Sequence, residues 1–334
     1  MTNELSFPHR RAGHCGSGAL RDLLEHHGLD YGDGPLSEGM VFGLAGGLGF
    51  FYAESTAFIP PFYLVGRTAD LERDIAKNLE AQVEVRETDD ADLGWSWVAD
   101  ELAAGRPVMV WADIAKLEYL RVKMSNTRHD ILIVGHDPES DIAWVADNDR
   151  EELQTCSLKS LAAARTSSGF PGPNRNTTFL YTWPEALPHL RTATRRAVAQ
   201  AVTNMTAEAP EVAGLTGGFG LAGVDAFLAG YERWPETLAE LLPSALPGLW
   251  VFVVKAGTGG AMFRSLHSTF LLEASTLLKD SQLAAVADHY DQLAARWIEL
   301  AECAKRGTHA EGLPLVRLIR DLEHRGVEMM EALR

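Results

Sequence analysis

The sequence predicts a mixed α+β fold with an antiparallel sheet, followed by an all-helical domain. Up to Trp183, short apolar runs of strand length alternate with amphipathic helical stretches. The two clearest strand-like runs are joined by a turn, which favours antiparallel pairing. After Pro184 the pattern becomes almost wholly helical. We therefore expect two domains, residues 1–187 and 188–334.

The first helix is expected directly after a glycine-bracketed turn, in the stretch HCGSGALRDLL. Ala19, Leu20, Leu23 and Leu24 recur there at helical spacing, which places Cys15 in or next to the first turn. Unpaired N–H groups and the positive end of the helix dipole favour a thiolate at that position. Cys15 is therefore a candidate nucleophile. The alternative is a small buried hydrophobic residue that begins a helix.

Further elements follow along the chain. The stretch LSEGMVFGLAGGLGFFY, residues 36–52, predicts a short helix that ends at Gly46 and Gly47. Its glycine-rich, aromatic continuation must pack closely against another element. Strands are expected at 62–65, 82–86, 107–112 and 177–183, and helices at 68–80 and 92–104.

The strongest strand pair is HDILIVG, residues 129–135, and IAWVAD, residues 142–147. In an antiparallel hairpin the start of the first strand lies beside the end of the second, so His129 and Asp147 should be neighbours. A cysteine nucleophile needs an imidazole base and a third group that orients the imidazole. The sequence therefore predicts a catalytic triad of Cys15, His129 and Asp147.

The segment directly before His129 is a second source of candidate residues. If His129 is catalytic, Asp113, Tyr119 and Arg128 should line the approach to it and contact substrate. The alternative is a solvated loop with a short helix.

The C-terminal region predicts packed helices. A helix is expected at 191–205, and in 283–303 Val286, Tyr290, Leu293 and Trp297 fall on one core-facing stripe. The glycine run 257–260 reads as a turn that opens a further helix.

On that further helix Arg264 and His267 share a face, and they are candidate substrate-binding residues. Arg264 near a helix start suits a carboxylate or a phosphate, as of a pantetheine arm. The alternative is a structural ion pair, with Glu273 as the partner. GFGLAG at 218–223 matches a nucleotide-binding pattern, but no convincing strand precedes it, so we reject that interpretation.

Composition excludes several classes of function. The chain of 334 residues is 46% hydrophobic with a net charge of −16, which argues against a nucleic-acid binder and suits a cationic small molecule. An acidic protein partner would need a local basic patch, such as 9–11 or 191–196. No metal-ligand spacing appears, so we expect neither metal nor cofactor.

Three widely spaced cysteines do not form a disulfide framework. The N-terminal residues lack the apolar core of a signal peptide, and no apolar run is long enough to cross a membrane. A reducing cytoplasmic location without membrane contact is expected.

The order Cys15, His129, Asp147 resembles that of the papain-like cysteine enzymes. More specifically, the N-terminal half resembles the butirosin biosynthesis protein H family. HCGSGALRDLL, LSEGMVFGLAGGLGFFY, the His129 strand with ILIVGHD, and the Asp147 strand carry this resemblance. Through GTGGAMFRSLHSTFLLEA the helical region resembles the domain of unknown function that commonly follows this module.

The resemblance implies a papain-like fold and an acyltransferase of secondary metabolism. Cys15 would accept an acyl group from an acyl carrier protein or acyl-CoA thioester, and an amine, or alternatively a hydroxyl group, would receive it. His129 would act as base and then acid, and Asp147 would orient it. Papain-like enzymes usually place a Gln six residues before the cysteine, where this chain has His9. Either His9 or the backbone N–H of Cys15 would then serve as the oxyanion donor.

Three alternatives remain open at this point. A cysteine hydrolase such as an amidase or peptidase, and an intramolecular cyclase, would use the same triad. A non-catalytic binding protein would have retained only the fold. The helical region also offers faces for association of identical chains.

Overall fold

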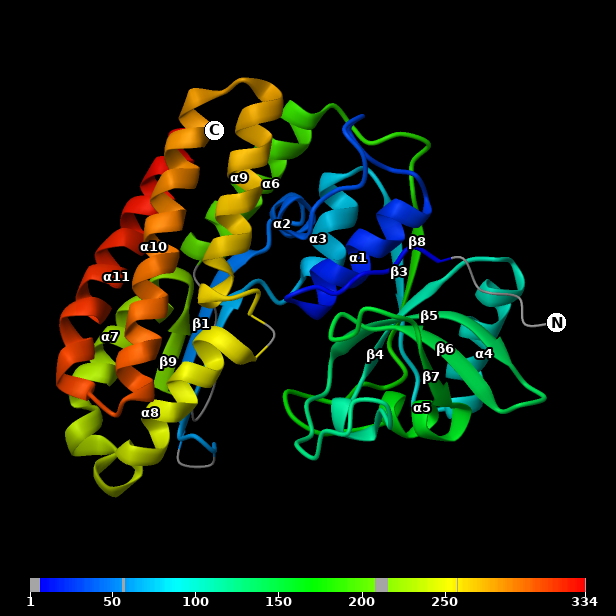
Figure 1. The fold of residues 1–334 in the computed structure, drawn as a ribbon, viewed down its shortest axis with the longest axis horizontal. Coiled ribbons are helices and arrows are strands. Elements are labelled where there is room, and N and C mark those ends of the chain that lie inside the picture. Colours follow the sequence, from blue (N-terminus) through cyan, green and yellow to red (C-terminus); the bar gives the residue numbers. More distant parts are fainter. Residues whose placement is uncertain (1–6, 56–57, 208–215, 257, 334) are drawn as a thin grey trace. The chain divides into compact units, whose positions relative to one another are not determined.

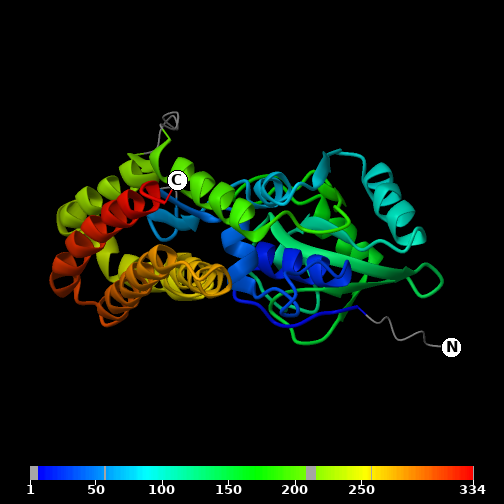
Figure 2. The same ribbon diagram turned by 90° about the horizontal axis from the view of Figure 1, so that it is seen from above.

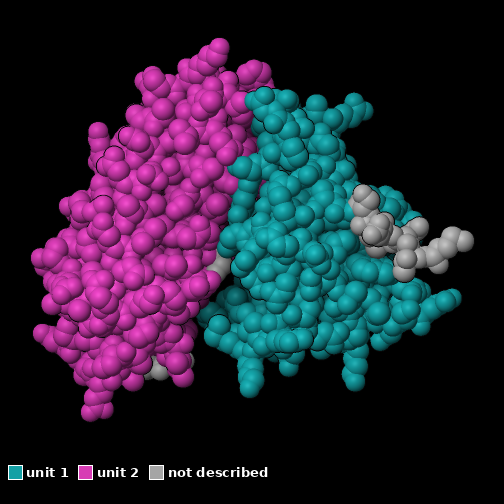
Figure 3. All heavy atoms as spheres, viewed as in Figure 1, with its two compact units in different colours: residues 1–38, 80–187 teal, residues 39–79, 188–334 magenta. Residues whose placement is uncertain are grey.

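The computed structural model describes residues 7–55, 58–207, 216–256 and 258–333. The chain forms two compact units, each built from two separate segments (Figure 3). Unit 1 comprises residues 1–38 and 80–187, and unit 2 comprises residues 39–79 and 188–334.

Unit 1 is built on a six-stranded antiparallel sheet with the strand order β3-β8-β4-β5-β6-β7 (Figure 1). Its strands are β3 (Gln82–Arg86), β4 (Val108–Ala112), β5 (His129–Asp137), β6 (Ile142–Ala146), β7 (Gln154–Ser157) and β8 (Thr178–Thr182). Its helices are α1 (Cys15–His26), α4 (Ala91–Ala103), η1 (Ile114–Lys116) and α5 (Leu158–Arg165).

The central strand β5 is buried on both faces of this sheet. Ile131 and Ile133 point into a core cluster that includes Val98 of α4. Because side chains alternate along a strand, Asp130 and Leu132 point to the opposite face. Helix α1 packs against β5, and Figure 2 shows α1 and α4 on opposite sides of the sheet. The sheet therefore presents the start of β5 to the first turn of α1.

Unit 2 combines a small sheet with most of the helices. Its antiparallel sheet has the order β2-β1-β9, with β1 (Leu48–Glu54), β2 (Phe62–Arg67) and β9 (Thr216–Phe219). The helices are α2 (Glu38–Leu44), α3 (Leu71–Asn78), α6 (Leu190–Thr206), α7 (Gly220–Thr237), η2 (Ala239–Leu241), α8 (Leu242–Trp250), η3 (Val251–Lys255), η4 (Ala261–Phe263), α9 (Arg264–Leu278), α10 (Ser281–Lys305) and α11 (His309–Glu331).

The α+β class and the helical character of the C-terminal region are confirmed, and the predicted stripe of α10 is buried. The two units differ from the expected domains, 1–187 and 188–334, in one segment. Residues 39–79 were expected in the N-terminal domain, but they belong to unit 2 together with the C-terminal region. The reason is strand pairing, because β1 hydrogen-bonds to β9 of the C-terminal region. Gly43 also leaves room for the ring of Phe270, which a Cβ would meet at 1.8 Å.

Three strands were not expected: β1 and the two short strands β7 and β9. Strand β9 begins two residues before the GFGLAG stretch and includes its first two residues, where no strand was expected. Because β9 runs antiparallel to β1, it forms no βαβ unit, and the rejected nucleotide-binding interpretation stays rejected. The glycines allow close packing instead: a Cβ on Gly223 would lie 2.5 Å from the carbonyl oxygen of Gly218.

In the described part of the chain, no single helix combines the length and the apolar character needed to cross a membrane. The pair formed by 220–237 and 239–255 passes the same test only jointly, with a bend of 104° between its halves.

Candidate active site

Helix α1 begins at Cys15, as predicted. His14 is its N-cap, and the Nδ1 atom of His14 accepts a hydrogen bond from the N–H of Ser17 at 3.2 Å. Capping of this kind fixes the first turn and directs the free N–H groups of the helix towards the region around Cys15. The thiol therefore lies at the positive end of the helix dipole.

Glu38 holds the residues that lead into this turn. Its carboxylate accepts hydrogen bonds from the N–H groups of Gly13 at 2.9 Å and His14 at 2.8 Å, and from the hydroxyl of Ser17 at 3.0 Å. A carboxylate at a helix start also stabilises the helix through its dipole. Nothing in the sequence pattern connects Glu38 with Cys15, and its role is visible only in the fold.

Asn148 ties the same turn to the end of β6. The backbone carbonyl of Asn148 accepts a hydrogen bond from the N–H of Ala12 at 2.9 Å. The side-chain amide of Asn148 donates to the carbonyl of Ala12 at 3.1 Å. Gly18 allows this approach, because a Cβ there would lie 2.6 Å from Cβ of Ala12. The residue after Asp147 thereby positions the segment before Cys15.

The predicted His–Asp pair is present. Nε2 of His129 lies 3.0 Å from Oδ2 of Asp147, and the Asp147 side chain is fully buried. The hydroxyl of Tyr119 donates to the same oxygen at 2.8 Å. Because Asp147 accepts from Nε2–H, Nδ1 of His129 is the atom left to exchange a proton with Cys15.

The electrostatics of the site favour a thiolate–imidazolium pair. Burial raises the pKa of Cys15, but the charge of His14 and hydrogen bonds from His129 and His14 outweigh it and hold that pKa well below its ordinary value. Burial lowers the pKa of His129, yet the Asp147 carboxylate and Cys15 raise it well above the ordinary imidazole value.

The carboxylate of Asp147 stays ionised at the base of this pair. Burial raises its pKa, but the charge and hydrogen bond of His129, followed by the hydroxyl of Tyr119, hold the pKa below its usual value. Cys15, His129 and Asp147 thus form a connected chain of hydrogen bonds in which a thiolate can act as nucleophile.

A further carboxyl group, missed by the sequence reasoning, lies at the thiol. Oδ2 of Asp130 is 3.6 Å from Sγ of Cys15, and Asp130 is 1% exposed. Its position directly after His129 was the available signal, because alternation along β5 turns Asp130 to the face on which α1 packs, and α1 begins at Cys15.

The three residues expected to line the approach to His129 have different surroundings. Tyr119 holds Asp147, as described above. Asp113 is buried, and its carboxylate accepts from the hydroxyls of Ser125 and Ser167 and from two backbone N–H groups, which fixes the loop after β4. Arg128 is exposed, with its guanidinium 5.1 Å from the Trp111 ring centroid. Substrate contact by these residues stays a prediction.

His9 is held by Asp22, with Nδ1 2.6 Å from Oδ2, and its side chain is 4% exposed. Among the described residues its Nε2 atom has no hydrogen-bond partner. A carboxylate only accepts, so Nδ1 carries a proton and Nε2 can donate only when His9 is an imidazolium. The oxyanion role of His9 stays a prediction.

Arg264 and His267 do not lie at an accessible surface. Arg264 is fully buried and pairs with both oxygens of Glu323, at 2.8 and 2.9 Å, rather than with Glu273 as expected. Its Nη1 donates to backbone carbonyls, including that of Gly66 at 2.8 Å. The structural ion pair, weighed as the alternative, replaces the expected substrate contact.

His267 is 1% exposed, and its Nε2 lies 3.3 Å from Sδ of Met330. Burial lowers the pKa of His267 to about 3, so it is neutral in the core. Both residues expected to bind substrate from this helix are therefore core residues of unit 2.

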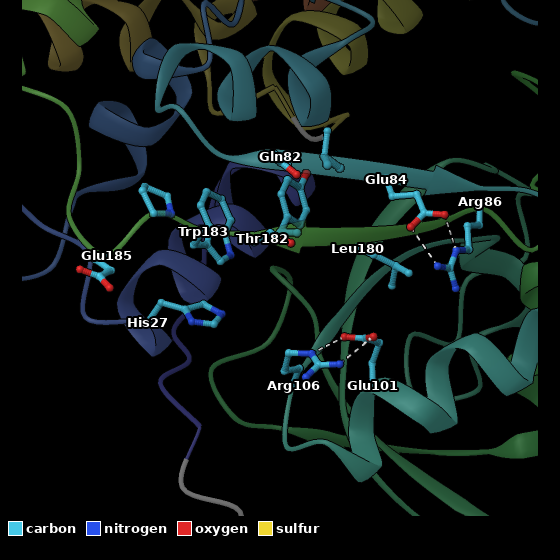
Figure 4. Close-up of a pocket in the computed structure, with 13 residues that line it drawn as sticks. His27, Gln82, Glu84, Arg86, Glu101, Arg106, Leu180, Thr182, Trp183 and Glu185 are labelled. Atoms are coloured by element: carbon cyan, nitrogen blue, oxygen red, sulfur yellow. Dashed lines mark hydrogen bonds and ion pairs between the residues drawn. The ribbon is translucent and has the colours of Figure 1, made fainter.

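Unit 1 also contains a pocket of about 650 Å³ (Figure 4). It is lined by Trp183, His27 and two paired arginines, Arg86 with Glu84 and Arg106 with Glu101. His27 follows the last residue of α1, so at 1.5 Å per residue the pocket lies about 18 Å along the helix from Cys15. The pocket is separate from the triad.

Within the described residues, no group of three or more His, Cys, Asp or Glu side chains is arranged to hold a metal ion.

Comparison with protein-family models matches both parts of the chain. Residues 14–148 match the model of butirosin biosynthesis protein H, N-terminal, and residues 159–333 match a domain of unknown function (DUF4872). A search of curated proteins found no match. The first match contains Cys15, His129 and Asp147. The chain therefore belongs to the butirosin biosynthesis protein H family, with its papain-like N-terminal domain followed by the domain of unknown function.

Proposed function

We propose that this protein is a cysteine-dependent acyltransferase of a biosynthetic pathway. It would move an acyl group from a carrier-protein or coenzyme A thioester to an amine, through an acyl-enzyme on Cys15. The observation that carries the proposal is the hydrogen-bonded chain from Cys15 through His129 to Asp147, at the start of α1. Membership of a family of biosynthetic, acyltransferase-like enzymes agrees with it.

In the first half-reaction the Cys15 thiolate attacks the donor thioester. A new S–C bond forms, the donor C–S bond breaks, and the His129 imidazolium gives its proton to the departing thiolate. Exchange of one thioester for another is nearly balanced in energy, so the enzyme must mainly supply a reactive thiolate and a proton donor. Asp147 and Tyr119 keep the His129 ring oriented for this transfer.

In the second half-reaction an amine attacks the acyl-enzyme. A C–N bond forms, the C–S bond to Cys15 breaks, and neutral His129 accepts a proton from the attacking nitrogen. The negative charge that develops on the acyl oxygen would be met by the N–H groups at the start of α1, and by His9 as imidazolium. The thiolate–imidazolium pair is then restored.

The charge of the chain supports the proposed amine acceptor and bears on the donor. A net charge of −16 attracts a cationic amine and would repel an acidic carrier protein outside a local basic patch. The mechanism also needs a reduced Cys15, and all three cysteines are free. We therefore place the reaction in the reducing cytoplasm.

The test supplies a simple acyl thioester and a primary amine and follows both thiol release and amide formation. We expect amide formation by the wild-type protein and by Cys156→Ala, which changes a buried cysteine, and none by Cys15→Ala. Release of free acid at the same rate with and without amine would identify a hydrolase. Ring closure of a tethered amine without an external acceptor would identify a cyclase. No turnover, with an unreactive Cys15, would identify a binding protein.

A further inference from the structure

Asp130 is a buried carboxyl group in contact with the nucleophile, and the triad makes no use of it. It occupies the second position of β5, opposite Trp111 of β4, and its side chain points to the face on which α1 packs. Only 1% of the residue is exposed, and its Oδ2 lies 3.6 Å from Sγ of Cys15. A group so close to sulfur is also close to any acyl carbon bonded to that sulfur.

In the free enzyme this contact requires a proton. A thiolate and a carboxylate 3.6 Å apart would repel each other, so beside the His129 imidazolium the Cys15 thiolate and Asp130 share one proton between Sγ and Oδ2. Acylation removes this arrangement, because a thioester sulfur carries no proton and accepts poorly. Asp130 then lies beside the acyl group and no longer shares a proton with Cys15.

We propose that the Asp130 carboxylate receives the acceptor amine as an ammonium ion and takes its first proton. This inference rests on the proposed function and specifies its acceptor: a primary amine that is protonated at neutral pH. A carboxylate at this place attracts the ammonium ion and generates the nucleophilic free amine next to the acyl carbon. Water and alcohols receive no such attraction, so Asp130 favours transfer over hydrolysis.

The protons balance over one cycle. The ammonium ion gives one proton to Asp130, and the free amine attacks the acyl carbon. The nitrogen then gives a second proton to His129 as the C–S bond breaks. The amide leaves, and the enzyme again holds two protons among Cys15, Asp130 and His129. One of these reaches the donor thiol in the next acylation and the other reaches solvent, which accounts for both protons that the ammonium ion loses.

The test separates the half-reactions in Asp130→Asn, which keeps the shape of the side chain and removes its charge. Cys15 is acylated with the acetyl thioester of N-acetylcysteamine, and the acyl-enzyme is then mixed with propylamine or with hydroxylamine near pH 7. Propylamine is protonated at that pH and hydroxylamine is mostly neutral. We expect the propylamine rate constant to fall about 100-fold or more, and the hydroxylamine and acylation rate constants to fall less than about 10-fold.

Two further variants complete the design. Asp130→Glu keeps a carboxylate and should retain much of the preference for propylamine. Asp137→Asn makes the same exchange at the other end of β5, about 23 Å away, and should leave all three rate constants at the wild-type level.

Equal losses with propylamine and hydroxylamine in Asp130→Asn would overturn the inference, as would loss of acylation itself, which would assign Asp130 to the first half-reaction. Both results leave the proposed acyl transfer intact. A wild-type protein that the thioester does not acylate overturns the proposed function instead, and the inference with it.

Discussion

The reactivity of Cys15 arises from its immediate neighbours as much as from its helix. Cys15 and Cys303 both lie in helices and Cys156 in a strand, yet Cys15 alone among them is not buried, and its neighbours lower its pKa. Burial raises the pKa of Cys156 to about 11. The difference comes from His14 and His129, which lower the pKa of Cys15. Neither histidine acts on the pKa of Cys156.

Alkylation by iodoacetamide should report this difference directly. Because the pKa of Cys15 is lowered, the thiolate is present at pH values below the ordinary thiol range, and Cys15 should react there while the other two cysteines do not. His129→Ala and His14→Ala should each move the alkylation profile to higher pH. Acylation by a thioester should decline again at high pH, where His129 loses its raised proton. A wild-type profile at the ordinary thiol range would contradict the assigned ion pair.

Tyr119 should act through Asp147 rather than on substrate. Tyr119→Phe removes one hydrogen bond to the carboxylate, so kcat/KM should fall about 2- to 10-fold, which corresponds to roughly 1 kcal/mol. Asp147→Asn should lower kcat/KM much more, by up to about 10⁴-fold, because the asparagine would not hold His129 in the tautomer that the reaction needs. Tyr181→Phe makes the same change on β8 and is the control. A rise in KM alone in Tyr119→Phe would assign the hydroxyl to substrate binding.

At the scale of elements, periodicity predicts those that bury a continuous apolar face. The strand at 129–135 was predicted from its run of four consecutive apolar residues, and the helix at 283–303 from apolar residues that recur every three to four positions. Strands β7 (QTCS) and β9 (TGGF) carry too few apolar residues for such a pattern. They form because they hydrogen-bond to neighbouring strands. Those strands lie outside the short stretch of sequence from which a strand is predicted.

Helix α9 illustrates how a charged residue can be misassigned. Arg264 pairs with Glu323 of α11, and Trp297 of α10 donates to the same carboxylate at 2.9 Å. We expect Arg264→Met to lower the free energy of unfolding by about 3–5 kcal/mol, because it leaves Glu323 buried and uncompensated. Arg264→Met combined with Glu323→Leu should recover most of that loss. Urea unfolding measures both variants. An unchanged stability with a raised KM for a coenzyme A donor would instead support the phosphate-binding role.

At the scale of the whole molecule, sequence reasoning anticipated the contact between His129 and Asp147 but only part of the architecture. That contact could be predicted because the hairpin that joins the two residues is local in the sequence. Glu38, Asn148 and Asp130 were missed, because each acts through an approach between segments far apart in the sequence. Likewise, residues 39–79 join unit 2 through pairing of β1 with β9, which no reading of consecutive residues would indicate.

The central claim is that Cys15 carries the acyl group, and mass spectrometry of the intact chain tests it most directly. After brief incubation with an acetyl thioester and without amine, we predict one added acetyl mass, located by digestion on the peptide that contains Cys15. Addition of a primary amine should remove that mass and produce the corresponding amide. Cys15→Ala should gain no mass. Acetyl mass that remains in Cys15→Ala, or an adduct on Cys15 that no amine removes, would contradict the account.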